Sequence, residues 1–297
     1  MAQLKKIEIG AQSMYSKLET VLIKKAEDAF ISQKYIDENY KKYNYVGRPI
    51  MKNLKRDYES FESILRDHVK NIYYLPKDPA SGIDSVYTHD TLKVTEKGAI
   101  YFQMGKVLRR NEPALARKYL ESIGVPTLGS ITGTGTMEGG DVVWVDPKTV
   151  AIGLGYRTNA EAIRQFEKIT KGIVREVITV QLPHADGKER VLHLQSLISI
   201  IDRDLVVMYS RYLSAFLREY LIERGFNIIE VSDDEYLTMG TNVLALSPRK
   251  CVMLKGNKNV KKSIEEYGGE VFEYDGMDLS MKGEGGPTCM TAPLFRL

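Results

Sequence analysis

The stretch M-E-G-G-D-V-V-W, Met137–Trp144, places a carboxylate, two glycines and a second carboxylate directly before an apolar run. The run Val142–Val145 predicts a buried strand, and Glu138 stands where that strand begins. A glycine pair at this point lets the backbone turn sharply or approach another segment closely, which would hold both acids at the rim of a sheet. An ordinary loop before a strand explains the stretch equally well on its own, so its recurrence along the chain decides the interpretation.

The chain repeats one order of elements, in which a strand, a turn and a second strand precede a helix and a third strand. The unit that contains Met137–Trp144 continues through a helix at Asn159–Thr170 to its third strand. The first strands of the four internal units are expected at Ser85–Thr88, Val142–Val145, Leu192–Ile201 and Val243–Leu246. A fifth unit would combine the C-terminal end of the chain with a strand at Thr20–Lys24, an amphipathic helix at Asn53–Lys70 and a strand at Ile72–Leu75.

Chemically distinctive residues recur with the same period. At or just before successive first strands stand Asp84, Glu138, His193, Thr241 and Cys289, at separations of 54, 55, 48 and 48 residues. Five units, the last of which is completed from the other end of the chain, would close a ring that joins the termini and leaves no free sheet edge. Equivalent positions of the units would then face one central cavity.

The composition limits the classes of function. The chain has 297 residues, of which 43% are hydrophobic and 27% are charged, so it can bury a large core. Its formal net charge of +3 predicts neither a nucleic-acid partner nor a membrane partner. Since no apolar segment opens the sequence, the expected location is cytoplasmic. We expect residues 1–10 to be an N-terminal extension and residues 11–297 to form a single catalytic domain.

The chain has two cysteines, and neither stands in a spacing typical of a disulfide framework or a zinc site. Cys251 lies in an apolar strand and is expected to be a core thiol. Cys289 shares the repeat position with His193 and Glu138. A cysteine, a histidine and carboxylates in one cavity are the groups that nucleophilic catalysis requires.

A negative cavity around a thiol favours a cationic substrate. Asp84 and Asp90 would add their charges to that of Glu138, and an anionic substrate would be repelled. A planar cation with several N–H groups would instead pair with the carboxylates in bidentate fashion, and a guanidinium fits this description. Its central carbon is an electrophile that a thiolate can attack, while His193 exchanges protons with the reacting groups.

Five short motifs follow one another along the chain. They are D-S-V-Y-T-H-D at Asp84–Asp90, M-E-G-G-D at Met137–Asp141, Y-R-T-N-A at Tyr156–Ala160, V-L-H-L-Q-S at Val191–Ser196 and G-G-P-T-C-M at Gly285–Met290. Together they resemble the guanidino-group-modifying superfamily of dimethylargininases, arginine deiminases, agmatine deiminases and amidinotransferases, with dimethylargininase as the nearest branch. The resemblance runs from about Gly10 to the C-terminus. It implies an α/β fold, a five-bladed α/β propeller of strand–strand–helix–strand repeats with pseudo-fivefold symmetry, and neither a metal nor an organic cofactor.

The resemblance assigns a role to each matching residue. Cys289 is similar to the nucleophile that forms a covalent thiouronium intermediate, and His193 to the group that protonates the leaving amine and then activates water. Glu138 is similar to the carboxylate that contacts both His193 and the guanidinium. The positions expected to bind the substrate are Asp84, Asp90, Asp141, Arg157 and Gln195. Among these, Arg157 is similar to the arginine that holds the α-carboxylate of the substrate.

Departures from the family's patterns leave the substrate open. Deiminases and amidinotransferases usually carry an aspartate two residues after the catalytic histidine, whereas this chain has Gln195, which is similar to the dimethylargininase pattern H-L-K-S. An aspartate there would lose its N–H partners on a dimethylated substrate. Against this, the tail that begins at Cys289 resembles deiminases, and Gln103 stands about where dimethylargininases have a second carboxylate-binding arginine.

The sequence therefore predicts a cysteine-dependent hydrolase that converts a methylated arginine or an arginine-like guanidine to a ureido product such as citrulline. An arginine deiminase is the runner-up, and an amidinotransferase is a third alternative. A ring of five units can also be a binding module, as in the ribosome anti-association factor of translation, although such a module has no need for these three reactive residues. The run Asn39–Tyr45 is expected to be a solvated loop or a flap over the cavity, and exposed faces of the ring leave a homodimer open.

Overall fold

The computed structural model describes residues 7–297 as a mixed α/β fold with five three-stranded sheets. In each sheet the middle strand runs antiparallel to one neighbour and parallel to the other. A helix connects each middle strand to its parallel neighbour, as a parallel crossover requires. The predicted α/β class and the repeated order of strand, strand, helix and strand are therefore confirmed.

Four of the sheets are formed by consecutive stretches of chain. Their strands are β3 (Leu92–Thr95), β4 (Gly98–Tyr101) and β5 (Thr127–Ser130); β6 (Val142–Asp146), β7 (Thr149–Leu154) and β8 (Glu176–Gln181); β9 (Ile198–Asp202), β10 (Leu205–Met208) and β11 (Asn227–Glu230); and β12 (Leu244–Ser247), β13 (Lys250–Leu254) and β14 (Glu270–Tyr274).

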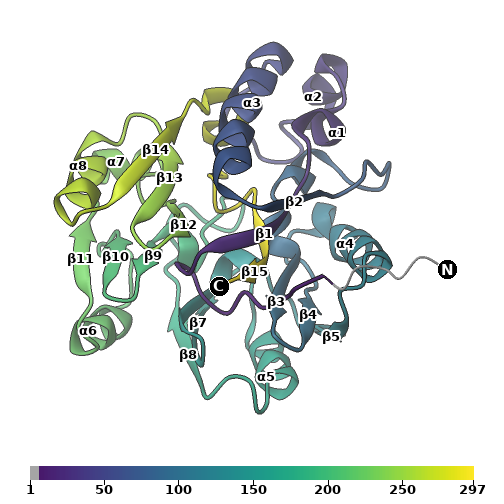
Figure 1. Cartoon of the computed structure of the whole chain (residues 1–297). Helices are drawn as coiled ribbons and strands as arrows, with labels where there is room; N and C mark the ends of the chain where they lie inside the picture. The colour runs from purple at the N-terminus through teal and green to yellow at the C-terminus, as the bar shows by residue number, and fades with distance from the viewer. Residues whose placement is uncertain (1–6) are drawn as a thin grey trace.

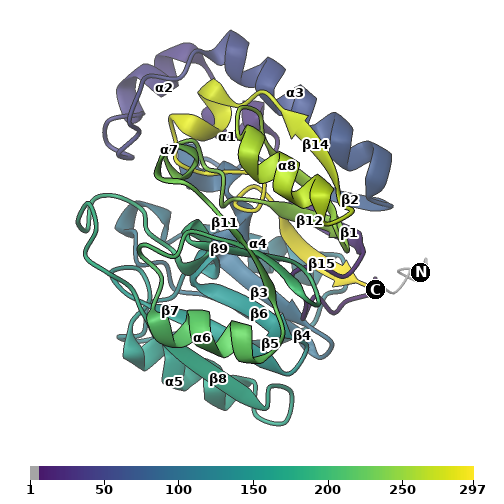
Figure 2. The ribbon, with the colours of Figure 1, turned by 90° about the vertical axis from the view of Figure 1, so that its left-hand side faces the viewer.

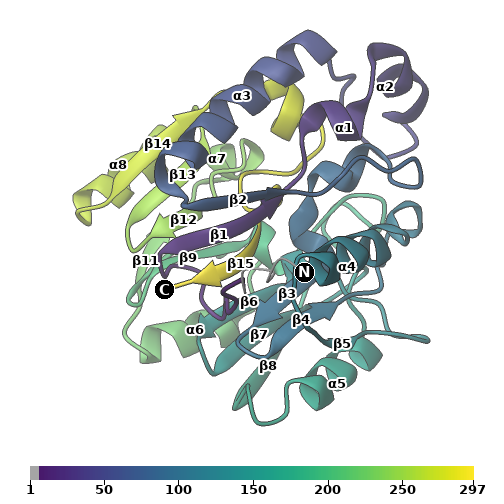
Figure 3. The ribbon, with the colours of Figure 1, turned by 45° about the vertical axis from the view of Figure 1, so that its right-hand side comes forward.

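The fifth sheet is built from both ends of the chain. It contains β1 (Leu18–Ile23), β2 (Asn71–Tyr74) and β15 (Ala292–Arg296), with β1 in the middle. Figure 3 shows β1 and β15 side by side, and they pair antiparallel from Leu18 opposite Arg296 to Leu22 opposite Ala292. The prediction that the N-terminal strand completes the last unit is thus confirmed.

The connecting helices lie at the periphery of the molecule, outside the sheets (Figures 1 and 2). They are α3 (Met51–His68), α4 (Glu112–Ser122), α5 (Ala160–Ile169), α6 (Ala215–Glu223) and α8 (Lys258–Glu266), and three short helices are α1 (Ala26–Phe30), α2 (Gln33–Asn39) and α7 (Asp233–Leu237). The helix expected from residue 53 to residue 70 is α3, whose Leu54, Tyr58, Phe61 and Leu65 recur every three or four residues and are buried. The short helices were not predicted.

One predicted strand is wrong. Residues 85–88 belong to two 3₁₀ turns, η1 (Ile83–Val86) and η2 (Thr88–Thr91), and the first strand of this unit is β3. Polar side chains bind the local backbone there, since the hydroxyl of Ser85 donates to the carbonyl of Gly82 at 2.6 Å and that of Thr91 to the carbonyl of Thr88 at 2.8 Å. Such bonds favour turns over strands.

Comparable turns precede other first strands. The turn η4 (Gly139–Asp141) leads into β6, and η5 (Leu194–Ser196) shortens the strand expected at 192–201 to β9. The remaining turns are η3 (Val107–Arg109) and a π-turn, η6 (Met277–Met281). A residue placed just before a first strand is therefore held by a tight turn rather than by the strand itself.

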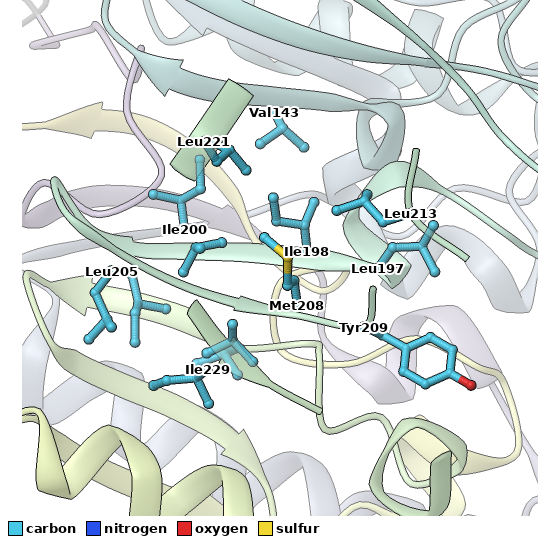
Figure 4. Close-up of a cluster of buried hydrophobic side chains, with 14 of the residues drawn as sticks. Val143, Leu197, Ile198, Ile200, Leu205, Met208, Tyr209, Leu213, Leu221 and Ile229 are labelled. Carbon is cyan, nitrogen blue, oxygen red and sulfur yellow. The ribbon is translucent and has the colours of Figure 1, made fainter. Parts of the chain in front are cut away.

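Apolar strands supply the core. All four residues of β10 are buried, and the cluster in Figure 4 packs them against β9, α6 and β11. It includes Ile198, Leu205, Met208, Leu221 and Ile229, with Val143 of β6 reaching the same cluster. Because branched side chains fill both faces of these strands, the sheets hold the turns at their ends in place.

Near the N-terminus, Gly10 is joined to the last strand, with its N–H donating to Leu294 and its carbonyl accepting from Arg296, each at 2.9 Å. Part of the extension expected at residues 1–10, namely residues 1–6, lies outside the described residues, and the boundary at residue 10 stays a prediction. Across residues 7–297, no helix combines the length and the apolar character that crossing a membrane requires.

Candidate active site

The turns that precede the first strands meet at one cavity of about 290 Å³. The turn η4 contacts both η2 and η5, which brings Asp90, Glu138 and His193 together from distant parts of the chain. Seven of the eight predicted site residues line the cavity, namely Asp84, Asp90, Glu138, Arg157, His193, Gln195 and Cys289. The eighth, Asp141, lies behind the cavity wall.

The glycine pair Gly139–Gly140 is required by close packing of the turns. A Cβ atom on Gly139 would lie 2.1 Å from the carbonyl oxygen of His89, and one on Gly140 would lie 2.3 Å from Nδ1 of His193. Both contacts are far shorter than van der Waals distance, so a side chain at either position would displace its neighbour. The pair thus allows η4 to pack directly against the segments that carry the reactive side chains.

Glu138 and His193 form a hydrogen-bonded pair at the cavity. Nε2 of His193 lies 2.8 Å from Oε2 of Glu138, and Nδ1 lies 3.8 Å from Oδ1 of Asp90. The Glu138 side chain is fully buried, and its other oxygen accepts the backbone N–H of Lys106 at 2.8 Å. Arg157 donates to Oε2 at 3.3 Å. Glu138 is therefore fixed on both oxygens and orients the imidazole ring.

The surroundings of His193 favour its protonated form. Burial opposes the imidazolium, but three nearby carboxylates outweigh burial and raise the pKa of His193 to about 8. These carboxylates belong to Asp90, Asp141 and Glu138. Burial also opposes the charge of Glu138, yet the hydrogen bond from His193 and the charge of Arg157 lower the pKa of Glu138 below its ordinary value. Near neutral pH the pair is an imidazolium beside a carboxylate.

Arg109, which the sequence analysis missed, holds Asp90. Its guanidinium donates to Oδ2 of Asp90 at 2.6 Å, to the carbonyl of Tyr87 at 2.8 Å and to Glu112 at 3.0 Å. Burial acts against the Asp90 carboxylate, but His193 and Arg109 overcome it and hold the pKa of Asp90 well below its ordinary value. For Glu112 burial prevails and raises the pKa to about 7.

Cys289 is held by a second residue that was missed, Asn242. The amide Nδ2 of Asn242 donates to Sγ of Cys289 at 3.3 Å, while its carbonyl accepts the N–H of Thr288 at 3.1 Å. The carbonyl of Cys289 accepts the N–H of His89 at 3.1 Å. Burial and the charge of Asp90 raise the pKa of Cys289 to about 11, so the sulfur is a thiol in the ligand-free protein.

Asp84 is paired at the cavity with Lys106. The Nζ atom of Lys106 lies 2.6 Å from Oδ2 of Asp84 and donates to the carbonyl of Tyr43 at 2.6 Å. Tyr43 and Asn44 line the cavity, and Tyr43 is buried. Of the two alternatives for residues 39–45, these contacts favour a flap over the cavity.

Two predicted residues have internal partners. Asp141 accepts the hydroxyl of Thr158 at 2.6 Å and the N–H of Leu194 at 3.0 Å, and burial raises its pKa to about 6. It therefore links two segments of the site rather than facing the cavity. Gln195 faces the cavity and donates from Nε2 to the carbonyl of Val142 at 3.2 Å, while its Oε1 has no hydrogen-bond partner among residues 7–297.

Local sequence contains only weak signals for the missed residues. Asn242 directly follows Thr241, which holds the repeat position of its unit, and this neighbourhood could have indicated it. Arg109 stands beside Arg110 in a charged segment without such a signal. Gln103, which stands about where dimethylargininases have a second arginine, donates to the carbonyls of Gly133 and Gly135 at 2.9 and 2.6 Å and does not line the cavity.

The cavity has one group of potential metal ligands among the residues described. Donor atoms of Asp90, Glu138 and His193 lie within 4.8 Å of one another, and all three residues are buried. Two of these groups already bind arginines, because Asp90 pairs with Arg109 and Glu138 with Arg157. A divalent cation would face these positive charges, so the arrangement favours proton transfer over metal binding.

Comparisons with known proteins agree with this geometry. A family model described as N,N dimethylarginine dimethylhydrolase, eukaryotic, matches residues 28–296. A Bacillus subtilis protein described as uncharacterized protein YkgA is 28% identical over 95% of this chain and 93% of its own length. An arginine deiminase of Latilactobacillus sakei is 24% identical over 77% of this chain, which spans 63% of the length of that enzyme.

Solved structures show the same fold. A cysteine-to-serine mutant of DDAH from Pseudomonas aeruginosa, complexed with citrulline, has a TM-score of 0.76 and 22% identity over 93% of this chain and 99% of its own. An amidinotransferase from Microseira wollei has a TM-score of 0.78 and 15% identity over 98% of both chains.

Fold, motifs and family match together place the chain in the guanidino-group-modifying superfamily, close to dimethylargininase, as the sequence motifs predicted. Within that superfamily, the chain belongs to the N,N dimethylarginine dimethylhydrolase family.

Proposed function

We propose that this protein hydrolyses a guanidino substrate, a methylated arginine or a close analogue, to a ureido product such as citrulline and an amine, through a thiouronium intermediate on Cys289. The observation that carries the proposal is the Glu138–His193 pair, with Nε2 and Oε2 2.8 Å apart, in the same cavity as Cys289. The family match and the names of the relatives support it. Arginine deiminase relatives keep release of ammonia from arginine as the second candidate, ahead of amidino transfer.

The charges of the cavity suit a guanidinium and explain how the thiol would ionise. The pKa of Cys289 is about 11 and that of His193 about 8, so below pH 8 the imidazole is already protonated and does not accept the thiol proton. A guanidinium bound beside the sulfur would stabilise the thiolate and release the proton to solvent. Substrate binding would therefore create the nucleophile.

Two half-reactions follow from these protonation states. The thiolate of Cys289 attacks the guanidinium carbon, a C–S bond forms, and the C–N bond to the leaving amine breaks as His193 gives that nitrogen a proton. The neutral imidazole then takes a proton from a water that adds to the same carbon. When the C–S bond breaks, the sulfur leaves as thiolate, the added hydroxyl gives its proton to solvent, and the ureido product is released. Glu138 would orient the imidazole in both steps.

Gln195 is our candidate for the choice of substrate. An uncharged amide at this position does not require the far nitrogens of the guanidinium to carry hydrogens, so alkyl groups are tolerated. Its unpartnered Oε1 would still accept one N–H, and leaving such a buried acceptor unpaired costs about 1–3 kcal/mol. Gln195 therefore favours methylated arginine over arginine.

The architecture supports several further parts of the proposal. We infer that the five sheets are the blades of a pseudo-fivefold propeller, since first strands of different sheets contact one another, β15 with β3 and β9 with β12. A single catalytic domain at residues 11–297, a cytoplasmic location and a homodimer stay predictions of the sequence.

The test is ureido-product formation from arginine, ω-monomethylarginine, asymmetric dimethylarginine and agmatine. Wild-type protein should prefer the methylated arginines, and Cys289→Ser should form no product while retaining its circular dichroism spectrum. Cys251→Ser is the matched control, because that thiol is buried in β13 away from the cavity and should leave turnover unchanged. Gln195→Asp should shift the preference toward arginine. Full turnover by Cys289→Ser would refute the proposed chemistry, and turnover of arginine alone by the wild type would favour the deiminase.

A further inference from the structure

A second, smaller cavity lies behind one wall of the first. Thr288 and His89 line the small cavity, whereas their chain neighbours Cys289 and Asp90 line the large one. The two turns that carry these residues are joined by the hydrogen bond from His89 N–H to the carbonyl of Cys289 and by a 2.7 Å contact of His89 Nδ1 with the carbonyl of Thr291. One wall built from two turns therefore separates the two cavities.

Three polar atoms of residues that line the small cavity have no hydrogen-bond partner among residues 7–297. They are Nε of Arg296, Nε1 of Trp144 and Oγ1 of Thr288. The residues are 7%, 1% and 4% exposed, so bulk water does not satisfy these atoms. Two of the atoms are obligate donors and the hydroxyl can donate as well. Because unpaired buried donors are rare and unfavourable, three of them around one cavity indicate an occupant that accepts hydrogen bonds.

The same cavity contains two basic side chains, Lys93 and Arg296. Nδ1 of His89 must donate to the carbonyl that it contacts, so its Nε2 accepts from Nζ of Lys93 at 2.6 Å. Nη1 of Arg296 donates to the carbonyl of Ala245 at 2.9 Å and to that of Ser16. The described residues that line the cavity include no aspartate or glutamate. Within the cavity the occupant therefore faces basic groups alone, since the carboxylates that act on Lys93, those of Asp90 and Asp141, lie outside the lining.

Burial disfavours the charged forms of both basic side chains. Burial lowers the pKa of Lys93 to about 7 and that of Arg296 to about 9. A negative charge between them would stabilise both protonated forms and raise both pKa values again.

We propose that the small cavity binds one monovalent inorganic anion of the size of chloride, held by Lys93, Arg296, Trp144 and Thr288. The free volume of about 20 Å³ suffices for a single small ion or water and excludes larger anions such as sulfate. An anion could accept hydrogen bonds from all of the lining donors at once, whereas one water molecule could accept from only two of them. The bound ion would stabilise the wall that carries Cys289 and Asp90.

Thermal unfolding in exchanged salts tests this proposal. Wild-type protein is compared in sodium chloride and in sodium gluconate at equal ionic strength and pH, because gluconate is too large for the cavity. Chloride should raise Tm by about 3 °C in a saturable manner. Arg296→Gln removes one charge and Trp144→Phe removes one donor while keeping the ring, and both should reduce the chloride response. Arg175→Gln, which changes an exposed arginine, is the matched control and should retain it.

Crystals grown in sodium bromide provide a second measurement, which holds even if Arg296→Gln does not fold. An anomalous bromide peak between Arg296 and Thr288 would support the proposal. Density that fits only water there, with no anomalous signal, would overturn it, as would an equal chloride response in the wild type and all three variants.

Discussion

Replacing Glu138 by glutamine tests the pair on which the proposed chemistry depends. Glu138→Gln keeps the size of the side chain but removes a negative charge 2.8 Å from Nε2 of His193. The remaining nearby carboxylates are those of Asp90, whose Oδ1 is 3.8 Å from Nδ1, and Asp141, whose oxygens bind other groups. The imidazolium loses its closest counter-charge, so the pKa of His193 should fall.

The size of this fall follows from the environment of the ring. The site raises the pKa of His193 from 6.5 to about 8, which corresponds to about 2 kcal/mol in favour of the imidazolium. A hydrogen bond to a charged group contributes about 1.5–3 kcal/mol, so losing this one suffices to return the pKa of His193 to its ordinary value or lower. At pH 7.5 the protonated fraction would fall from roughly three quarters to under about a tenth.

The assay is nuclear magnetic resonance of protein with isotope-labelled histidine, titrated from pH 5 to pH 9.5. The chain has four histidines, and His193→Gln assigns the resonance of interest by its absence. Turnover by Glu138→Gln should fall about 100-fold or more, as expected for impaired acid–base catalysis. Asp233→Asn is the control, because this exposed carboxylate pairs with Arg211 and should leave the pKa of His193 unchanged. An unchanged His193 pKa in folded Glu138→Gln would refute the role of Glu138 in raising that pKa beside Asp90 and Asp141.

Three further outcomes are expected. Gly140→Ala would displace His193, because the new Cβ would lie 2.3 Å from Nδ1 of the ring. Steady-state kinetics should show that turnover falls about 100-fold, and unchanged kinetics would mean that the ring has room to move. Arg109→Gln would leave Asp90 buried without its cation. A urea titration should show that the free energy of unfolding falls by about 3–5 kcal/mol, and a fall below about 1 kcal/mol would contradict the buried pairing. Raising the pH from 6 to 9.5 should cost the wild type about 2 kcal/mol more of that free energy than it costs His193→Gln. The stabilisation from the raised pKa of His193 is complete below pH 6.5 and is lost as the pH passes 8, whereas the other titrating groups are common to both proteins. An equal pH dependence in the two proteins would contradict the raised pKa.

The repeat and the motifs predicted much of the fold and the site because both depend on local pattern. Alternation of apolar strands with an amphipathic helix is readable from hydrophobic periodicity, and a constant separation of reactive residues follows from one unit of structure being repeated. The strand predicted at residues 85–88 is wrong because four residues are too few to distinguish the two-residue alternation of a strand from the three-residue repeat of a 3₁₀ turn. The side-chain bonds of Ser85 and Thr91 favour the turns, because each hydroxyl donates to the carbonyl three residues earlier in the chain.

Arg109 illustrates what periodicity does not reveal. Arg109 and Arg110 are adjacent and chemically identical, yet Arg109 is 3% exposed while Arg110 is exposed to solvent. The difference arises from partners about twenty residues away, Asp90 and the carbonyl of Tyr87. A buried arginine requires several acceptors at once, and only the folded chain shows which of two neighbours receives them.

The pairing of charges at the site determines what a substrate must supply. Asp84 is occupied by Lys106 and Asp90 by Arg109, so an incoming guanidinium meets engaged carboxylates rather than free ones. A ligand that carries only a guanidinium would leave the displaced cations without a counter-charge in a buried cavity, which is unfavourable. A substrate with an additional carboxylate can engage those cations while its guanidinium takes their former partners. For the hydrolase proposed above, we therefore expect an amino acid such as a methylated arginine to be favoured over agmatine, which lacks the carboxylate.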